Sequence, residues 1–353
     1  APLHYEPDAK LPAALLLGLA PWPFEFAHDI GPDALNAVLA GFALLLLWRG
    51  PMFPAMLVAS STLLFRPEMI AMAPVFAIAA LVLRPRRTKR DVVAAVLAFA
   101  LVVAIQVGYR TWFTGQPGLF GGLRIANAGA FNWTRTWIGT EKEAYDFVYA
   151  VTEGRLEELP ARAFANESER ALVEGMMREA HARGYSAELD ARFQALADQR
   201  RREHPLLWAS VRALNVVQVW LNLETNPTLL DALTPVPRVI RRPILGGLLL
   251  LRVFILLFAF IGAIQAWKRW RRGEADDLDR LTLLMFAYVV ARTLLVGIVL
   301  DWRVHRYVVS AWIPMIWCAI RGLSPMLARR SLSRGRGASA GADRSAAAAA
   351  ASG

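Results

Sequence analysis

The stretch "TLLFRPEMIAMAP", from Thr62 to Pro74, places an arginine, a proline and a glutamate between two strongly apolar runs. These runs are about 14 and 15 residues long, which corresponds to about 21–23 Å of α-helix each. Two helices this short that start at one membrane surface do not reach the other side of a hydrocarbon core about 30 Å thick. We therefore expect a helical hairpin whose charged turn is recessed in the membrane.

Composition extends the membrane interpretation to the whole chain. Of its 353 residues 56% are hydrophobic, which is more apolar surface than one soluble core of this length requires. The formal net charge of +11 does not indicate nucleic-acid binding, because the basic residues fall in short clusters between apolar runs. Cys318 is the only cysteine, so this sequence contains no intrachain disulfide and no cysteine-based metal cluster.

Further apolar runs predict the membrane-embedded helices. They cover residues 34–48, 52–65, 69–83, 91–110, 243–267, 281–300 and 307–320. A shorter run over residues 11–20 has the character of a truncated helix, and the sequence lacks an initial Met, so we expect further chain upstream. Several runs are shorter than the roughly 20 residues that span a bilayer, which is tolerable only inside a bundle that shields their ends.

Basic clusters predict the orientation of these helices. The Arg49 turn and residues 84–90, 268–272 and 321–336 belong on the cytoplasmic side, because cytoplasmic loops accumulate Lys and Arg. The predicted fold is an all-α, polytopic transmembrane bundle with a mostly helical extracytoplasmic segment. Its parts are N-terminal transmembrane helices (1–110), the extracytoplasmic segment (111–242), C-terminal transmembrane helices (243–322) and a disordered cytoplasmic tail (323–353).

Helix signals organise the extracytoplasmic segment. Asn166 and Glu169 have the spacing of a capping box at the start of one helix. Ser186 is the expected N-cap of the next helix, which Pro205 ends. Residues 206–222 are amphipathic and contain tryptophan, so they are suited either to lying on the membrane or to re-entering the bundle.

Several basic residues are expected at the depth of the Arg66 turn. Arg252 and Arg292 interrupt apolar runs, and His305 and Arg306 follow at the outer end of the next run. Buried charges are costly and normally serve a cavity, and arginine binds phosphate through two parallel hydrogen bonds. The pattern favours a lipid phosphate or diphosphate as ligand. Two structural alternatives stay open: a turn in which Arg66 only pairs with Glu68, and arginines that only fix helix packing.

Two of the acidic residues before the run over residues 34–48, Asp29 and Asp33, are candidates for chemistry. Helix capping explains Asp33, but Asp33 or Asp29 also suits a general base toward a sugar hydroxyl, or a ligand of a divalent cation that holds a phosphate. No HExxH, Walker A, GxSxG or Cys/His metal spacing occurs in the sequence. A divalent cation is therefore the one cofactor left open, and its ligands are unknown.

Four stretches resemble a known enzyme family. "DALNAVLAGFALLLL", "LLFRPEMIAMAPVFAIAALVL" and "GYRTWFTGQPGLF" resemble the middle of bacterial polytopic glycosyltransferases of the GT-C type. "HRYVVSAWIPMIW" resembles the Arg-Tyr…Pro pattern that opens a late helix in many of them. The protein-mannosyltransferase-like branch, glycosyltransferase family 39, is the most similar, and the likeness covers residues 21–120 and 280–320.

The resemblance implies an enzyme of the bacterial inner membrane that acts in the cell envelope. It would transfer a sugar from a polyprenyl-phosphate donor to a glycan, lipid or protein acceptor on the outer face. The family's second outer-loop acid corresponds to Asp33, or to nearby Asp29, and the late pair that contacts the carrier phosphate corresponds to Arg306 and Tyr307. The family's first-loop catalytic acid has no counterpart here, as expected if the N-terminal part is missing.

The complete expected site combines both lines of reasoning. The catalytic residues are Asp33 and Asp29. The donor phosphate is bound by Arg66, Arg252, Arg292, His305, Arg306 and Tyr307. Glu68 and Trp137 have supporting roles, and Trp137 packs against sugar or isoprene unless it only anchors the chain at the membrane interface.

Two other classes of protein also fit the sequence. A flippase or transporter of an anionic lipid needs the same arginines but no carboxylate, although such proteins commonly show two related halves that this sequence lacks. A non-catalytic membrane assembly subunit would tolerate the missing first loop.

Overall fold

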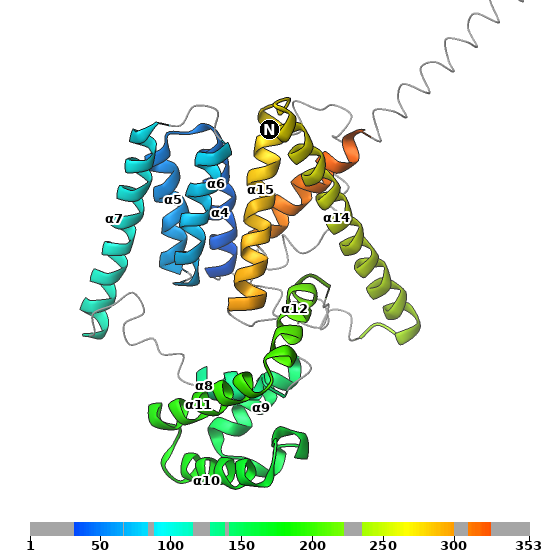
Figure 1. The fold of residues 1–353 in the computed structure, drawn as a ribbon. Helices are drawn as coiled ribbons and strands as arrows, with labels where there is room; N and C mark the ends of the chain where they lie inside the picture. The colour runs from blue at the N-terminus through cyan, green and yellow to red at the C-terminus, as the bar shows by residue number, and fades with distance from the viewer. Residues whose placement is uncertain are drawn as a thin grey trace, which may run out of the picture.

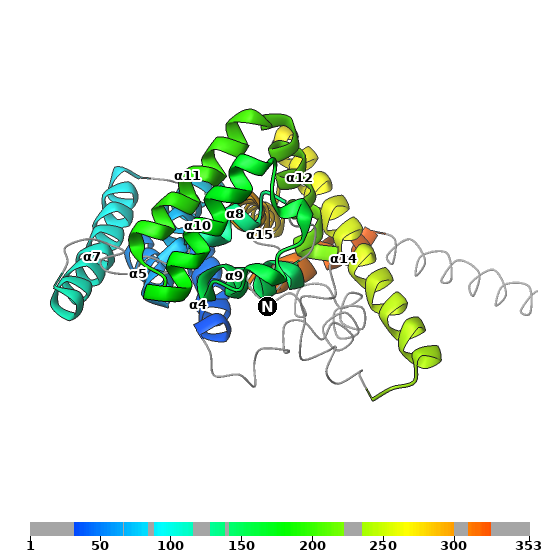
Figure 2. The ribbon, with the colours of Figure 1, turned by 90° about the horizontal axis from the view of Figure 1, so that it is seen from below.

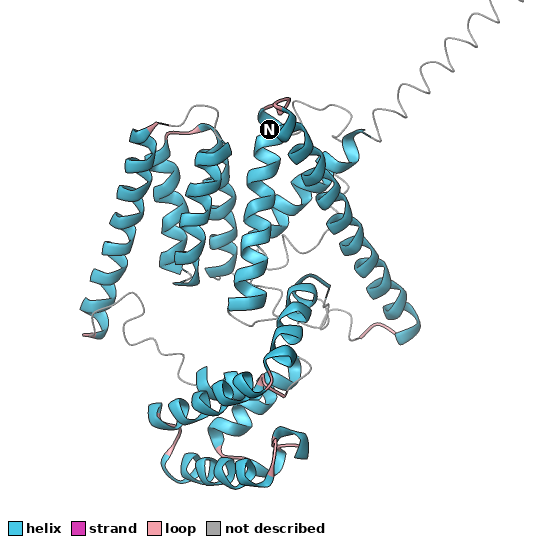
Figure 3. Ribbon diagram, in the orientation of Figure 1, coloured by secondary structure: helices cyan, strands magenta, loops and turns pink. Residues whose placement is uncertain are grey.

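In a computed structural model the chain is described over residues 32–65, 67–83, 88–115, 128–137, 141–221, 235–299 and 310–325. Within these ranges every regular element is a helix and no strand occurs, which confirms the all-α prediction (Figure 3). Figure 1 shows two parts, an array of long helices and a smaller group of helices at one end of the array. We call these the helix array and the small helical unit, and we name the two ends of the array the near and far ends relative to that unit.

The N-terminal half of the helix array contains α4 (Pro32–Arg49), α5 (Met52–Phe65), the 3₁₀ helix η2 (Pro67–Ala71), α6 (Met72–Leu83) and α7 (Lys89–Thr114). α5 packs between α4 and α7. The predicted hairpin is present, with its turn at the near end, and α7 extends beyond that turn (Figure 1). α7 begins with a capping box between Thr88 and Asp91 and ends at Gly115, whose positive φ of 69° a glycine adopts without strain.

The C-terminal half contains α14 (Arg238–Arg272), α15 (Asp277–Leu294), the π-helical segment η5 (Leu295–Val299) and a helix over residues 310–325. α14 and the helix over 310–325 touch through their backbones. A Cβ added to Gly262 would overlap the carbonyl oxygen of Cys318, and one added to Gly322 would overlap that of Phe258. Small residues that allow such close approach are typical of helix packing in membranes.

An ion cluster fixes the far end of this half. The buried carboxylate of Asp279, on the first turn of α15, accepts hydrogen bonds from Arg269 of α14 and from Arg321 of the helix over 310–325, the latter at 3.2 Å. Asp279 also belongs to a capping box with Asp276 at the start of α15. One carboxylate thus ties three helices together.

Apolar length identifies the membrane character of the array. Among the described residues, Lys89–Phe113, Arg238–Arg272 and Asp277–Ile298 are long and apolar enough to cross a membrane. The first two contain the predicted runs 91–110 and 243–267, and the third covers residues 281–298 of the predicted run 281–300. The other described apolar helices of the first half, Leu35–Trp48, Met52–Leu64 and Met69–Leu83, are shorter, as their runs predicted. Large apolar side chains such as Val96 and Phe260 are exposed on α7 and α14, which is the surface that lipid would cover.

The small helical unit contains α8 (Ala128–Thr134), α9 (Glu141–Glu153), α10 (Glu167–Arg183) and α11 (Ala187–Glu203), with short 3₁₀ turns at Leu156–Glu158 and Ala161–Ala163. It has a hydrophobic core of its own, centred on Trp133, Met176 and Phe193. Asn166 and Ser186 cap α10 and α11 as predicted. Seen from below, the unit lies across the near end of the array (Figure 2).

α12 (Pro205–Leu221) joins the two parts. It starts directly after α11, where Pro205 ends the preceding helix as predicted, and it packs against η5, α14 and α15. A Cβ on Gly297 would crowd Val216, so the two helices are in close contact, and Arg212 donates a 2.6 Å hydrogen bond to the carbonyl of Ile298. Of the two arrangements expected for residues 206–222, the structure has the one that enters the helix array.

Candidate functional site

The structure describes the side chains of Arg252, Arg292 and Trp137 among the site residues expected from the sequence. For Asp33 and Glu68 it describes the backbone only. Asp33 lies in the first turn of α4, which begins at Pro32, rather than before the helix. Outside the described residues are Asp29, Arg66, His305, Arg306 and Tyr307.

Arg252 lies where α12, α14 and the helix over 310–325 meet. Its side chain is fully buried, and its Nη1 donates a 3.2 Å hydrogen bond to the carbonyl oxygen of Trp220 at the end of α12. Its guanidinium carbon lies 5.9 Å from the ring centroid of Trp312, and the rings of Trp312 and Trp220 meet edge to face at 5.1 Å. Two tryptophans therefore form much of the environment of this arginine.

Arg292 lies against the turn that the sequence singled out. Its side chain is 1% exposed, and its Nη1 is 3.2 Å from the sulfur of Met69, the residue after Glu68 in η2. One turn earlier on α15, Tyr288 stacks on Phe76 of α6 and donates a 2.6 Å hydrogen bond to Ser310. The structure thus brings Arg292 next to η2, the element that carries Glu68.

Trp220 connects the surroundings of the two arginines. Its carbonyl accepts from Arg252, while its indole Nε1 donates a 2.9 Å hydrogen bond to Thr293, the neighbour of Arg292 in the chain. Both arginines lie well away from the far end, about 30 Å along α14 from Arg272 and about 22 Å along α15 from its start. They share one region in the near half of the array.

An apolar pocket opens beside this region. Its volume is about 540 Å³, and its wall is formed by α12, α14, α15 and the helix over 310–325. Trp220 and Thr293 line it and also take part in the hydrogen bonds beside the arginines; other lining residues are Leu256, Phe260, Val289 and Met315. This apolar lining is chemically suited to a hydrocarbon chain, and the chain neighbours of both arginines, Val253 and Thr293, belong to it.

Trp137 lies in the other part of the molecule. Its ring contacts Trp133 at 5.5 Å and Phe147 at 5.2 Å, and it packs against the core of the small helical unit. It is therefore apart from Arg252 and Arg292. A contact of Trp137 with sugar or isoprene remains a prediction.

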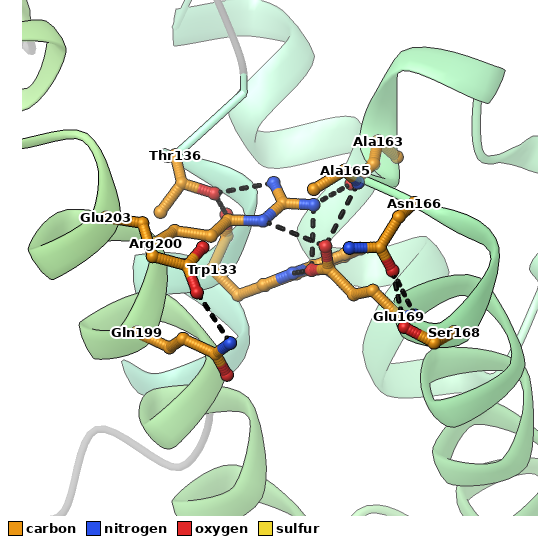
Figure 4. Close-up of polar contacts among 10 residues, drawn as sticks. All are labelled: Trp133, Thr136, Ala163, Ala165, Asn166, Ser168, Glu169, Gln199, Arg200 and Glu203. Atoms are coloured by element: carbon orange, nitrogen blue, oxygen red, sulfur yellow. Dashed lines mark hydrogen bonds and ion pairs between the residues drawn. The ribbon is translucent and has the colours of Figure 1, made fainter.

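An extensive polar network among the described residues also belongs to the small helical unit (Figure 4). The carboxylate of Glu169 accepts from Trp133 Nε1 at 3.0 Å and from the backbone N–H of Ala165 at 3.0 Å, and it forms an ion pair with Arg200 at 2.7 Å. Arg200 also donates to Thr136 at 2.9 Å and to the carbonyl of Ala163 at 2.6 Å. These contacts join α8, α10 and α11 into one unit.

This network corrects one detail of the predicted capping box. Asn166 accepts from the backbone N–H of Glu169 at 2.8 Å, as expected, but the Glu169 carboxylate turns to Ala165 and Arg200 instead. Burial alone would raise the pKa of Glu169, yet the hydrogen bonds from Arg200, Trp133 and Ala165 outweigh it, so the pKa lies below its usual value. Because the Glu169–Arg200 pair has these hydrogen bonds, we assign it a structural role in the small helical unit.

Metal binding is not supported by the described side chains. Within the described ranges, no group of three His, Cys, Asp or Glu residues is placed to hold a metal ion. Asp29 and the side chain of Asp33 lie outside this description, so the divalent cation that the sequence left open stays open.

Comparison with known proteins identifies no relative. No family model matches the sequence, and no curated protein and no solved structure is significantly similar to the chain. The functional interpretation therefore depends on the chemistry and geometry of the molecule itself.

Proposed function

We propose that this protein is a polytopic membrane glycosyltransferase that takes a sugar from a polyprenyl-phosphate carrier and transfers it to an acceptor at the outer face of a bacterial inner membrane. The observation that carries the proposal is the position of Arg252 and Arg292. Both are buried in membrane-type helices in the near half of the array, and an apolar pocket lies beside them.

The buried arginines support the phosphate part of this proposal. A cationic side chain deep in a membrane helix costs about 2.5 kcal/mol or more, so it normally faces a cavity and serves it. Arginine stays charged when buried and matches the geometry of a phosphate. Two such side chains whose surroundings are joined by Trp220 suit a phosphate that arrives with a lipid.

The pocket supports the polyprenyl part. Its apolar wall and volume of about 540 Å³ suit the first isoprene units of a carrier, with the remaining chain in the bilayer. Trp220 lies at the boundary between pocket and arginine, because it lines the pocket and its carbonyl accepts from Arg252. A carrier bound with its chain in the pocket would have its phosphate close to Arg252.

Charge distribution supports the orientation. Basic residues gather at the helix ends that lie at the far end of the array. They are Lys89, Arg90, Lys268, Arg269, Arg271, Arg272 and Arg321. By the positive-inside rule this end would face the cytoplasm, so the near end with both arginines and the small helical unit would face outward. The small helical unit is then in position to select the acceptor.

In the proposed reaction the acceptor hydroxyl attacks the anomeric carbon of the sugar. A new carbon–oxygen bond to the acceptor forms, the bond from the anomeric carbon to the phosphate oxygen breaks, and Asp33 or Asp29 takes the hydroxyl proton. The polyprenyl phosphate leaves with the electron pair of the broken bond. Arg252 and Arg292 would stabilise the negative charge that develops on it.

The test uses the full chain in proteoliposomes containing one of several carriers: polyprenyl-phosphate mannose, glucose or arabinose. We expect one of them to yield transfer to an added acceptor or slow release of free sugar. Arg252→Gln and Asp33→Asn should reduce the rate, whereas Arg178→Gln on the exposed face of α10 should not.

Two outcomes would contradict the proposal. Sugar release that is unchanged in both Arg252→Gln and Asp33→Asn would remove these residues from the reaction. Movement of a labelled carrier across the bilayer without sugar release from any donor would favour a flippase.

A further inference from the structure

The first turns of α14 carry a cluster of basic residues that the proposed reaction does not use. Arg238, Arg241 and Arg242 lie at helical spacings of three and four residues, so their side chains share one face. Arg238 and Arg242 are exposed and Arg241 is half-buried. Across the described parts of the chain, no carboxylate forms an ion pair with any of the three. Their charge is available to a ligand.

Apolar side chains surround this cluster on the other sides of the helix. Val239 is 84% exposed, Ile240 55% and Ile244 39%. A helix with a basic face and exposed apolar residues is suited to the boundary between lipid headgroups and acyl chains. The apolar surroundings favour a lipid as the partner over a soluble polyanion.

Position makes the cluster unusual. Under the proposed orientation α14 starts at the outer surface, where the positive-inside rule predicts few basic residues. Three arginines within two turns at that surface are not explained by topology. A ligand that carries negative charge at headgroup level explains them.

The same face of α14 leads to Arg252. Arg241, Leu245, Leu248 and Arg252 follow the spacing of one helix face, and Arg252 lies about three turns and about 16 Å further along the helix. Further on, this face continues with Ile255 and Ala259, which are buried in the array. One helix face therefore connects an exposed basic cluster to a buried arginine.

We propose that Arg238, Arg241 and Arg242 form a surface site for the phosphate of an anionic lipid, at the start of a path along α14 to Arg252. A phospholipid headgroup and a polyprenyl phosphate present the same chemistry to these side chains. Binding at the surface site is independent of enzymatic activity, whereas the delivery of a sugar carrier along this path rests on the proposed function. Arginine suits the site because its planar guanidinium donates two hydrogen bonds to one phosphate.

The experiment titrates the full chain in detergent with defined lipids and measures bound lipid by native mass spectrometry. The lipids are a polyprenyl monophosphate, the neutral polyprenol of the same length, and phosphatidylglycerol. The test variant is R238Q/R241Q/R242Q, and the matched control R178Q/R183Q/R202Q removes three exposed charges from α10 and α11. Circular dichroism and gel filtration establish that both variants are folded.

We expect the test variant to bind the polyprenyl monophosphate roughly 100-fold more weakly at low salt, since each arginine near a lipid phosphate contributes about a factor of five. Binding of polyprenol should change by less than about twofold, and the control variant should match the wild type. Arg→Lys replacement of all three residues keeps the charge but loses the paired hydrogen bonds, so its affinity should lie between those of the wild type and the test variant. A parallel loss of phosphatidylglycerol binding would identify a general lipid-phosphate site, and a loss restricted to the polyprenyl phosphate would identify a carrier site.

Three results would overturn the inference: unchanged affinity of the test variant for both anionic lipids, an equal loss in the control variant, or an equal loss for polyprenol. The result is separable from the proposed function. Sugar transfer that depends on Arg252 while the test variant binds normally would refute the surface site alone. Loss of lipid binding without transfer from any donor would refute the enzyme alone.

Discussion

The small helical unit and the helix array both bury arginine, but in different surroundings. In the small helical unit Arg200 forms an ion pair with Glu169 and bridges three helices. In the helix array Arg252 donates to a carbonyl oxygen and lies over a tryptophan ring, and Gly262 and Gly322 provide the close contact between helices. The comparison teaches that a buried arginine can itself hold helices together, as Arg200 does. It can also lie among helices that other residues hold together, as Arg252 does. Four experiments test this distinction.

The largest effect is expected from Glu169→Ala. It leaves the charge of Arg200 buried without its carboxylate, and breaking such a pair costs about 3–5 kcal/mol. Hydrogen exchange of the full chain should be faster than in the wild type in α10 and α11 and unchanged in α15. Glu174→Ala, which removes an exposed pair with Arg170, should cost less than about 1 kcal/mol. Equal effects of the two variants would refute the framework role of Glu169.

The next effect separates stability from activity. Arg252→Gln should lower the rate of sugar transfer by about 10²–10³-fold, the range for removing a group that stabilises developing negative charge. Hydrogen exchange in the small helical unit should stay unchanged. Arg200→Gln should do the reverse, with faster exchange in α10 and α11 and a nearly normal rate of transfer per folded molecule. Equal changes in transfer rate and in hydrogen exchange for Arg252→Gln and Arg200→Gln would contradict the different roles of the two arginines.

A smaller effect tests how the helix array is held. Gly262→Ala places a Cβ against the Cys318 carbonyl and should destabilise the array by about 1–3 kcal/mol, as overpacking commonly does. Gly246→Ala on the same helix meets no atom within 4 Å and should be neutral or slightly stabilising. Thermal unfolding in detergent, followed by tryptophan fluorescence, measures both. Equal melting temperatures would show that the backbone contact is dispensable.

The smallest effect concerns pH. Because the folded-state pKa of Glu169 lies below its usual value, its ion pair contributes stability at neutral pH, and this contribution is lost as the pH falls through the folded-state pKa. The melting temperature of the small helical unit should therefore fall in acid. In Glu169→Gln this part of the pH dependence should be absent. An identical acid profile in both proteins would assign the pH dependence to other groups.

Local sequence signals predicted most of the helices. Apolar length located α7 and α14 within a few residues, and Asn166 and Ser186 cap the helices that their spacing indicated. These features depend on residues close together in the chain, which periodicity and capping rules describe. The hairpin formed by α5 and α6 also followed from the two short apolar runs alone.

Contacts between distant segments were beyond the sequence. Nothing local indicates that Arg292 lies against Met69, or that Trp220 links Arg252 to Thr293, because these contacts depend on how separate helices pack. For Trp220, the sequence indicated only that it belongs to an amphipathic stretch that contains tryptophan, residues 206–222. Glu169 was assigned to a local capping box, and its long-range partner Arg200 outweighed that geometry.

The course of α12 has a mechanical consequence. This single helix begins at the small helical unit and ends at the carbonyl that Arg252 contacts, so it acts as a lever about 25 Å long. A tilt of about 5° at its base displaces its tip by about 2 Å, which is enough to make or break a hydrogen bond. Any molecule that shifts the small helical unit would thereby change the surroundings of a buried arginine in the helix array without touching it.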